Sequence, residues 1–256
     1  MHSAAPMRPP QARIDGPAPW LAPLRAAAAP VQARLDAGAT VAQALNLPGS
    51  PRIFVDASEL PPGTAYETWI AGTGRVPTRD NLHDLCNGLA WHAWPALKTR
   101  LNALQAQALA RDGVGSTRGP LRDALTHFDE HGALLRAPAE LCLALRERRW
   151  ADLFVHRRVV WAQARLDVVG HALVEQLLTA PRKGLTAHVI FGSAADAAAL
   201  TADRWAARPF VPLPVLGVPG WWPANDEPAF YVDASVFRPA RRGAMGPVDL
   251  KADGAP

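Results

Sequence analysis

Two histidines and a glutamate have the types and spacing that a metal site requires. His83 lies four residues before Asn87 in a segment expected to be helical, and His171 and Glu175 have the same separation at the start of another expected helix. Side chains four residues apart on a helix share a face, so His171 and Glu175 can act as a two-ligand arm. Imidazole and carboxylate together suit Zn, Mn or Fe. We therefore predict a divalent metal held by His83, His171 and Glu175; the alternative for the last pair is a capping histidine beside a surface glutamate.

Four further side chains have the chemistry to assist a reaction at such a metal. His188, in the segment LTAHVIF, would be a fourth ligand or a general base, and Asp84 would orient a ligand through a hydrogen bond. Lys98 and Lys183 would neutralise charge that develops on the substrate. Only three of the 27 basic residues are Lys, which favours positions where a compact ammonium is needed. The first hypothesis is thus a metal-assisted hydrolase acting on a phosphoester or an amide.

Amide side chains indicate a second class of function. Asn and Lys are scarce in this chain, yet Asn81, Asn87, Lys98 and Asn102 fall within one window, and Gln105 follows. Amides make directional hydrogen bonds but do little acid–base chemistry. The second hypothesis is therefore a non-catalytic protein that recognises a small polar molecule or a peptide through the four amides. A third is a buried polar network that fixes the fold and nothing more.

Composition argues against several partners. The net charge of +4 follows from an Arg-rich composition, and charged segments are short, such as RERR at 146–149, so nucleic acid is not expected to bind. No stretch approaches the roughly 18 apolar residues of a membrane span. Cys86 and Cys142 form neither a CxxC pair nor a disulfide framework, which is typical of a reducing compartment. We expect a soluble, cytoplasmic protein.

Helices and a small sheet are expected to position these residues. Helices are predicted from about 80 to 91 and from 95 to 111, and they carry the amide-rich window. The segment ALTHFDEHGALLRA (124–137) predicts a β-hairpin, with the carboxylate pair Asp129 and Glu130 in its turn. Strands at 165–169 and 185–191 on either side of a helix predict a βαβ unit with neighbouring parallel strands.

These elements predict one mixed α+β domain, mostly helical, over residues 20–240. Residues 1–19 contain five prolines and no hydrophobic period, so we expect a disordered leader there. Residues 241–256 are expected to be a loose tail.

Four blocks of the chain resemble a bacterial family catalogued as domain of unknown function 3025. The blocks are VPTRDNLHDLCNGLAWHAWPALKTRLNALQ (76–105), RDALTHFDEHGALL (122–135), GHALVEQLLTAPRKGLTAH (170–188) and LPVLGVPGWWPAN (213–225). The resemblance implies a soluble, single-domain protein of proteobacterial type. It brings no substrate, cofactor or catalytic residue, but its blocks coincide with the polar residues described above.

Overall fold

The computed structural model describes residues 12–113 and 119–239. Helices predominate and two small sheets are present, so the mixed α+β class is confirmed. The helices are α1 (Arg25–Asp36), α2 (Val41–Leu45), α3 (Tyr66–Thr73), α4 (Leu82–Ala93), α5 (Pro95–Asp112), α6 (Pro120–His131), α7 (Ala139–Arg146), α8 (His171–Thr179), α9 (Ala194–Ala198) and α10 (Ala202–Ala206). The strands are β1 (Ile53–Asp56), β2 (Arg75–Thr78), β3 (Gly132–Arg136), β4 (Arg165–Val168), β5 (Thr186–Phe191) and β6 (Val211–Pro214).

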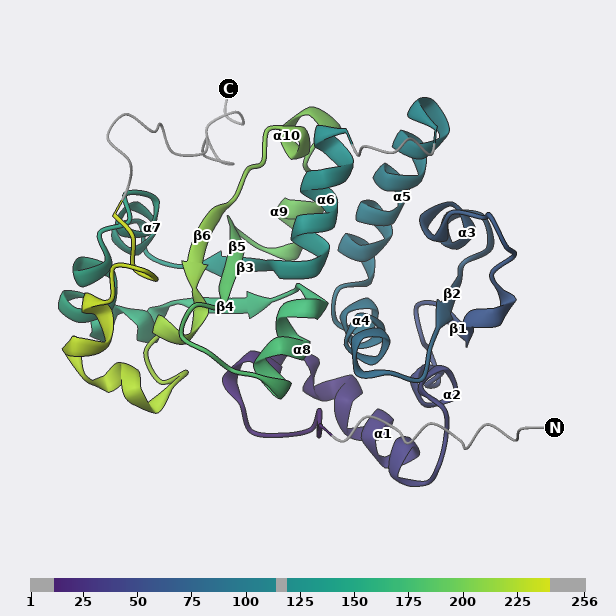
Figure 1. The fold of residues 1–256 in the computed structure, drawn as a ribbon, viewed down its shortest axis with the longest axis horizontal. Helices are drawn as coiled ribbons and strands as arrows, with labels where there is room; N and C mark the ends of the chain where they lie inside the picture. The colour runs from purple at the N-terminus through teal and green to yellow at the C-terminus, as the bar shows by residue number, and fades with distance from the viewer. Residues whose placement is uncertain (1–11, 114–118, 240–256) are drawn as a thin grey trace.

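The two sheets lie on either side of a group of helices. β1 and β2 form a parallel pair, and the larger sheet has the order β4-β3-β5-β6. In Figure 1 the four-stranded sheet lies on the left and the two-stranded sheet on the right, with α4, α5 and α8 between them. A single cluster of buried apolar side chains extends along the chain from Ile14 to Phe237. This shared core holds α4, α5, α6 and α8 against one another.

The expected β-hairpin over 124–137 is wrong. The first part of this segment belongs to α6, and only its second part is a strand, β3. Pro120 occupies the first turn of α6, where its missing N–H costs no hydrogen bond. The residues that α6 buries, Ala124, Leu125 and Phe128, follow a helical spacing and not the alternation of a strand. DEHG is therefore the end of a helix, and Asp129 and Glu130 lie on α6.

The expected βαβ unit is also wrong. β3 lies between β4 and β5, so those two strands are not neighbours. β3 is antiparallel to β4 and parallel to β5, and hence β4 and β5 run in opposite directions. The reason is that β3, taken from the sequence as half of a hairpin, inserts into the sheet. Helix α8 still follows β4 directly, and Gly170 between them donates to the carbonyl of Gly132 at 2.8 Å.

The packed part of the chain begins before Trp20. Ile14 is fully buried, and its N–H donates to Oε1 of Gln32 at 3.2 Å. The expectation of a disordered leader therefore does not hold for the residues from 12 onward. Residues 1–11 and the predicted tail at 241–256 lie outside the described residues. In the part of the chain that the structure describes, no helix has the length and apolar character to cross a membrane.

Candidate metal centre

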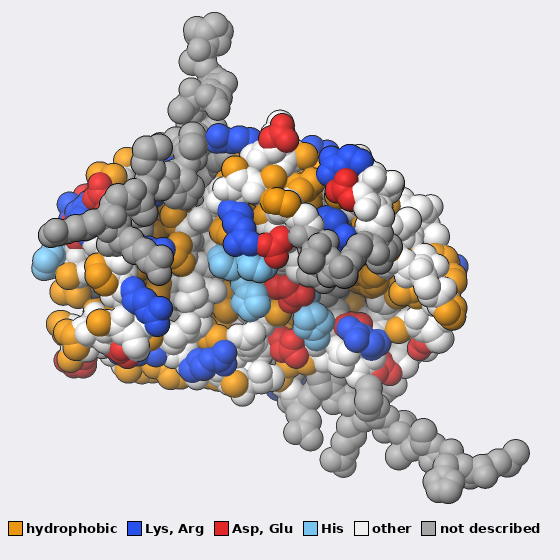
Figure 2. Space-filling view, turned by 45° about the horizontal axis from the view of Figure 1, so that its top comes forward, with side chains coloured by type: hydrophobic (Ala, Val, Ile, Leu, Met, Phe, Trp, Pro, Cys, Tyr) orange, Lys and Arg blue, Asp and Glu red, His pale blue; other side chains and the backbone are white. Residues whose placement is uncertain are grey.

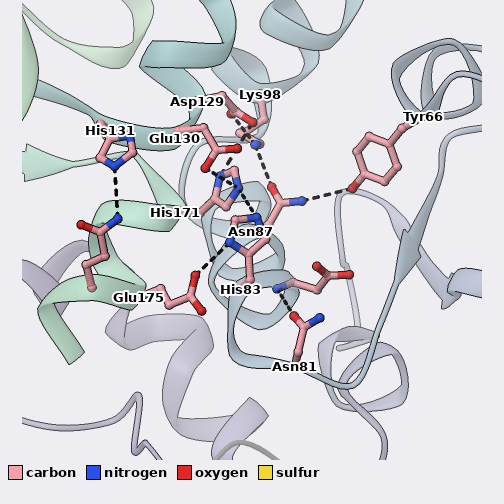
Figure 3. Close-up of polar contacts among 12 residues, drawn as sticks. Tyr66, Asn81, His83, Asn87, Lys98, Asp129, Glu130, His131, His171 and Glu175 are labelled. Atoms are coloured by element: carbon pink, nitrogen blue, oxygen red, sulfur yellow. Dashed lines mark hydrogen bonds and ion pairs between the residues drawn. The ribbon is translucent and has the colours of Figure 1, made fainter. Parts of the chain in front are cut away.

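Five helices, α3, α4, α5, α6 and α8, bring polar side chains to one pocket. α4 supplies His83 and Asn87, α6 supplies Asp129 and Glu130, and α8 supplies His171 at its first position. Lys98 approaches from α5 (Figure 3). The pocket has a volume of about 450 Å³, which is within the usual size of a small-molecule site. The site thus joins three of the sequence blocks that carry polar residues.

Two imidazoles and one carboxylate converge at the centre of this pocket. Nε2 of His83 and Nε2 of His171 are 3.1 Å apart, and Oε2 of Glu130 lies 3.7 Å from Nε2 of His171. One ligand atom from each of the three residues lies within 4.8 Å of the others. Two imidazole nitrogens bound to one tetrahedral zinc ion at ~2.0 Å are about 3.3 Å apart, so the observed spacing fits a shared ion.

Each imidazole turns its second nitrogen towards a carboxylate. Nδ1 of His83 is 2.9 Å from Oε2 of Glu175, and Nδ1 of His171 is 3.7 Å from Oδ2 of Asp129. The second distance is too long for a hydrogen bond, and Nδ1 of His171 is a buried nitrogen that has no hydrogen-bonding partner among the described residues. A carboxylate behind a metal-binding histidine fixes which nitrogen carries the proton, and so leaves Nε2 free to bind the ion. Both histidines therefore have their outer carboxylate on the side away from the shared centre.

Glu175 is not part of the converging group, although the sequence predicts it as a ligand. Its carboxylate reaches across from α8 to the α4 histidine, and Glu130 stands in the position expected for it. The structure thus brings His83 and His171 together as predicted and adds Glu130. Glu130 was missed because its segment was read as a turn; the helical spacing of Leu125 and Phe128 was the signal that could have placed it.

Behind the histidines lies a buried polar chain. Nζ of Lys98 donates to Oδ1 of Asp129 at 2.5 Å and to Oδ1 of Asn87 at 2.8 Å. Nδ2 of Asn87 then donates to the hydroxyl of Tyr66 at 3.1 Å. Lys98 is only 4% exposed, so its charge is satisfied almost entirely by these two partners. Lys98 therefore holds Asp129 in place beside His171 and does not project into the pocket.

Burial determines the protonation states in this chain. Desolvation lowers the pKa of His171 to about 3, because the carboxylate of Asp129 compensates only in part and Lys98 and His83 oppose the charged form. Burial alone would raise the pKa of Asp129, but Lys98 and the two histidines lower it below its ordinary value. Desolvation also raises the pKa of Tyr66, so its hydroxyl stays protonated. His171 is thus neutral at physiological pH, the form that binds a metal.

Asp84 and the predicted amides have partners within the chain. The side chain of Asn81 caps α4 by accepting from the N–H of Asp84 at 2.8 Å. The carboxylate of Asp84 accepts three hydrogen bonds from Arg79, and so does not contact the histidines. Asn102 donates to the carbonyl of Glu67 at 3.0 Å. Gln105 lines the pocket, and in the described part of the chain its side chain has no hydrogen-bonding partner.

The structure places His188 and Lys183 away from this pocket. His188 lies on β5, with its ring 5.5 Å from that of His127 and 4.8 Å from that of Phe210. Nζ of Lys183 is 3.4 Å from Asp233 and lies over an aromatic ring. Neither residue lines the pocket that contains the two histidines. The sequence offered no means of placing them, because their position depends on strand order.

The centre is open to solvent on one side. The side chains of His83 and Glu175 are 34% and 31% exposed, and that of Glu130 is 34% exposed, whereas His171 is buried. On the face drawn in Figure 2, histidine and acidic side chains gather in one area with basic side chains at its edge. An ion and a substrate would therefore have access to the centre.

The fold and the site define a mixed α+β protein with a candidate His–Glu–His metal centre between α4, α6 and α8. Over residues 53–241 the chain matches the family described as "Protein of unknown function (DUF3025)", and it therefore belongs to that family. The resemblance found in the sequence blocks is thus confirmed. No match was found among curated proteins or among solved structures.

Proposed function

We propose that this protein is a metal-dependent hydrolase whose divalent ion is bound by His83, Glu130 and His171. The observation that carries the proposal is the approach of the two Nε2 atoms to 3.1 Å, with Glu130 beside them and a carboxylate behind each ring. Two imidazoles with one carboxylate are a ligand set of hydrolytic zinc enzymes, and they also bind iron. The set leaves coordination positions open towards the pocket.

The residues of the chain have separate tasks in this proposal. A bound divalent ion would act as a Lewis acid that polarises a substrate carbonyl and activates water. Glu175 keeps the proton of His83 on Nδ1 through a hydrogen bond. Asp129, held by Lys98, lies 3.7 Å from Nδ1 of His171 and would favour a proton on that nitrogen through its charge alone. The pocket would bind the substrate next to Glu130. The partner of the protein is accordingly a small molecule or a short peptide end.

The contrasting explanation is a hydrogen bond between His83 and His171 in a purely structural network. It fits the same 3.1 Å distance if one Nε2 carries a proton. Asn87 and Lys98 do belong to a buried network, so this alternative has support from their contacts. The two explanations differ in whether an ion binds.

Metal analysis separates them. The protein would be purified without chelator and without a nickel column, and its metal content measured by mass spectrometry as purified and after loading with Zn, Mn or Fe(II). We expect about one equivalent of one metal, lost in His171→Ala and in the near-isosteric Glu130→Gln. Glu140→Gln, at an exposed carboxylate paired with Arg157, is the matched control and should keep the metal. Absence of metal after loading would leave the structural network as the explanation.

A further inference from the structure

The charges around the pocket restrict the substrate that the proposed hydrolase can accept. The acidic side chains that line it are Glu67, Asp84, Asp129 and Glu130, and the only lining cation among the described residues is Arg79. A divalent ion at the histidines would not reverse this balance. A pocket of this kind repels an anionic substrate and attracts a cationic one.

The two cations near the site are already neutralised. Arg79 makes a two-point contact with the carboxylate of Asp84, at 2.8 and 3.1 Å. Lys98 is buried against Asp129. Unpaired Arg or Lys side chains are favourable partners for the oxygens of a phosphoester, and the described part of this pocket offers none. The phosphoester branch of the hydrolase hypothesis therefore has no support from these charges.

Glu67 and Gln105 are two polar side chains of the pocket that have no partner among the described residues. Within the described residues, the Glu67 carboxylate makes no ion pair or hydrogen bond, and neither does the Gln105 amide. Gln105 as a whole is only 7% exposed. Both line the main pocket and also a small annex of about 50 Å³ that opens beside it. An amide that lines a pocket without a protein partner is available to hydrogen-bond a ligand or water.

The two residues are placed together by the packing of α3 on α5. Asn102 binds the backbone carbonyl of Glu67, and Gln105 follows Asn102 by three residues, nearly one helical turn, on α5. Tyr66 also lines both cavities, and its ring offers an aromatic surface next to the carboxylate. The annex also contains the ammonium of Lys98, which Asp129 neutralises, so its net charge remains negative.

We propose that Glu67 and Gln105 form a subsite for the positively charged group of the substrate, an ammonium or a guanidinium. The inference rests on the proposed hydrolase and narrows it: the scissile group is an amide at the metal, and an amine-bearing part of the same molecule occupies the subsite. Glu67 accepts the charge-assisted hydrogen bond and Gln105 accepts a further N–H.

Hydroxamates that differ only in their tail test the subsite. The probes are the hydroxamates of valeric acid, γ-aminobutyric acid and glutaric acid, which end in a methyl, an ammonium and a carboxylate, together with shorter and longer homologues. Their affinity for the metal-loaded full-length protein would be measured by calorimetry. We expect the ammonium compound to bind about tenfold more tightly than the methyl compound, and the carboxylate compound most weakly.

Variants assign the preference to the subsite. Glu67→Gln should remove the preference for the ammonium and leave both the metal content and the affinity of the methyl compound unchanged. Gln105→Leu should reduce the preference in part. Asp203→Asn, which changes an exposed acidic residue in the first turn of α10 just as Glu67 lies in the first turn of α3, should have no effect. Tightest binding of the carboxylate compound, or a preference that survives Glu67→Gln, would overturn the subsite.

Failure of the metal site would be seen separately. The metal content of each sample is measured first, and a protein that binds no metal contradicts the proposed hydrolase. Putrescine and succinate are then titrated into the chelated protein. Binding of putrescine that depends on Glu67 would support the subsite without the metal, and no binding of putrescine would refute it as well.

Discussion

His83 and His171 face one another edge to face, with ring centroids 4.6 Å apart and an angle of 74° between the ring planes. They come from α4 and α8, and the two residues are 88 positions apart along the chain. One ring is buried and the other is about one-third exposed, so the pair has an inner and an outer member. The inner member, His171, is the one whose position depends on the whole fold.

Glu130 and Glu175 should respond differently to substitution. Because Glu130 is placed as a ligand, Glu130→Gln should abolish metal binding in a competition assay with a chromogenic chelator. Glu175→Gln removes only the charge that orients His83, and should weaken binding about 10–100-fold. An equal loss in the two variants would make Glu175 a ligand, as the sequence suggested. Glu140→Gln serves again as the unaffected reference.

The buried pair of Lys98 and Asp129 should contribute strongly to stability. Lys98→Met leaves Asp129 without its cation, and we expect the free energy of unfolding to fall by about 3 kcal/mol. Chemical denaturation in the presence of a chelator measures this value. Lys183→Met removes a more exposed ion pair with Asp233 and should cost at most about 1 kcal/mol. Similar losses in the two variants would show that the Lys98 pair is not effectively buried.

His188 should make stability dependent on pH below neutrality. The pKa of His188 is lowered to about 4, chiefly by burial and to a smaller extent by the charges of His127, His131 and Arg208. The unfolded chain binds a proton at this residue near pH 6.5, and the folded protein does so only near pH 4. The contribution of His188 to the free energy of unfolding is therefore constant above about pH 6.5, the pKa of this residue in the unfolded chain. It falls as the pH decreases from about 6.5 to 4. Because solvent partly screens His188, we expect its protonation to lower the free energy of unfolding by at most about 2 kcal/mol.

Denaturation in chelator at several pH values tests this dependence. His188→Gln cannot titrate and should flatten the decrease between pH 6.5 and 4. His156→Gln, at an exposed side chain outside this cluster, is the control. An unchanged slope in His188→Gln would assign the decrease to other groups.

Gly170 should control the distance between α6 and α8. A Cβ atom at this position would lie 2.5 Å from backbone atoms of Glu130, His131 and Gly132, which cannot move independently of α6. Gly170→Ala should therefore cost about 1–3 kcal/mol and also weaken metal binding, because His171 follows directly. Gly72→Ala is the matched control: no atom of the described residues lies within 4 Å of an added Cβ, and the substitution should be neutral or stabilising. If Gly170→Ala kept its full metal affinity, the close approach at Gly170 would not be needed to position His171 for the metal.

The sequence located the site better than it located the sheet. The scarcity of Asn and Lys identified the α4–α5 region, and Asn87 and Lys98 are indeed hydrogen-bonded to each other there. The spacing of His83 and His171 within their helices was readable from local patterns. That the two helices face each other was not, because this depends on packing between residues far apart in the chain.

The error over α6 had consequences for the chemistry. If DEHG is a hairpin turn, β3 pairs within the hairpin and β4 and β5 are predicted to be neighbours. In the structure β3 lies between them. The same error placed Glu130 in a turn, whereas Glu175 was predicted as a ligand from its four-residue spacing to His171. A segment such as DEHG can be either a hairpin turn or the end of a helix. The helical spacing of the buried residues before it distinguishes the helix end from the turn.

The ligands of the proposed ion lie on α4, α6 and α8, and β3 continues directly from α6 at Gly132. No two of them are close in sequence, so an unfolded chain has no local fragment that could bind the ion in advance. The ion would then bind late in folding, after the three helices have packed. Once bound, it would link distant parts of the domain reversibly. Its main effect would be kinetic: the loaded protein should unfold more slowly, while its folding rate stays nearly the same.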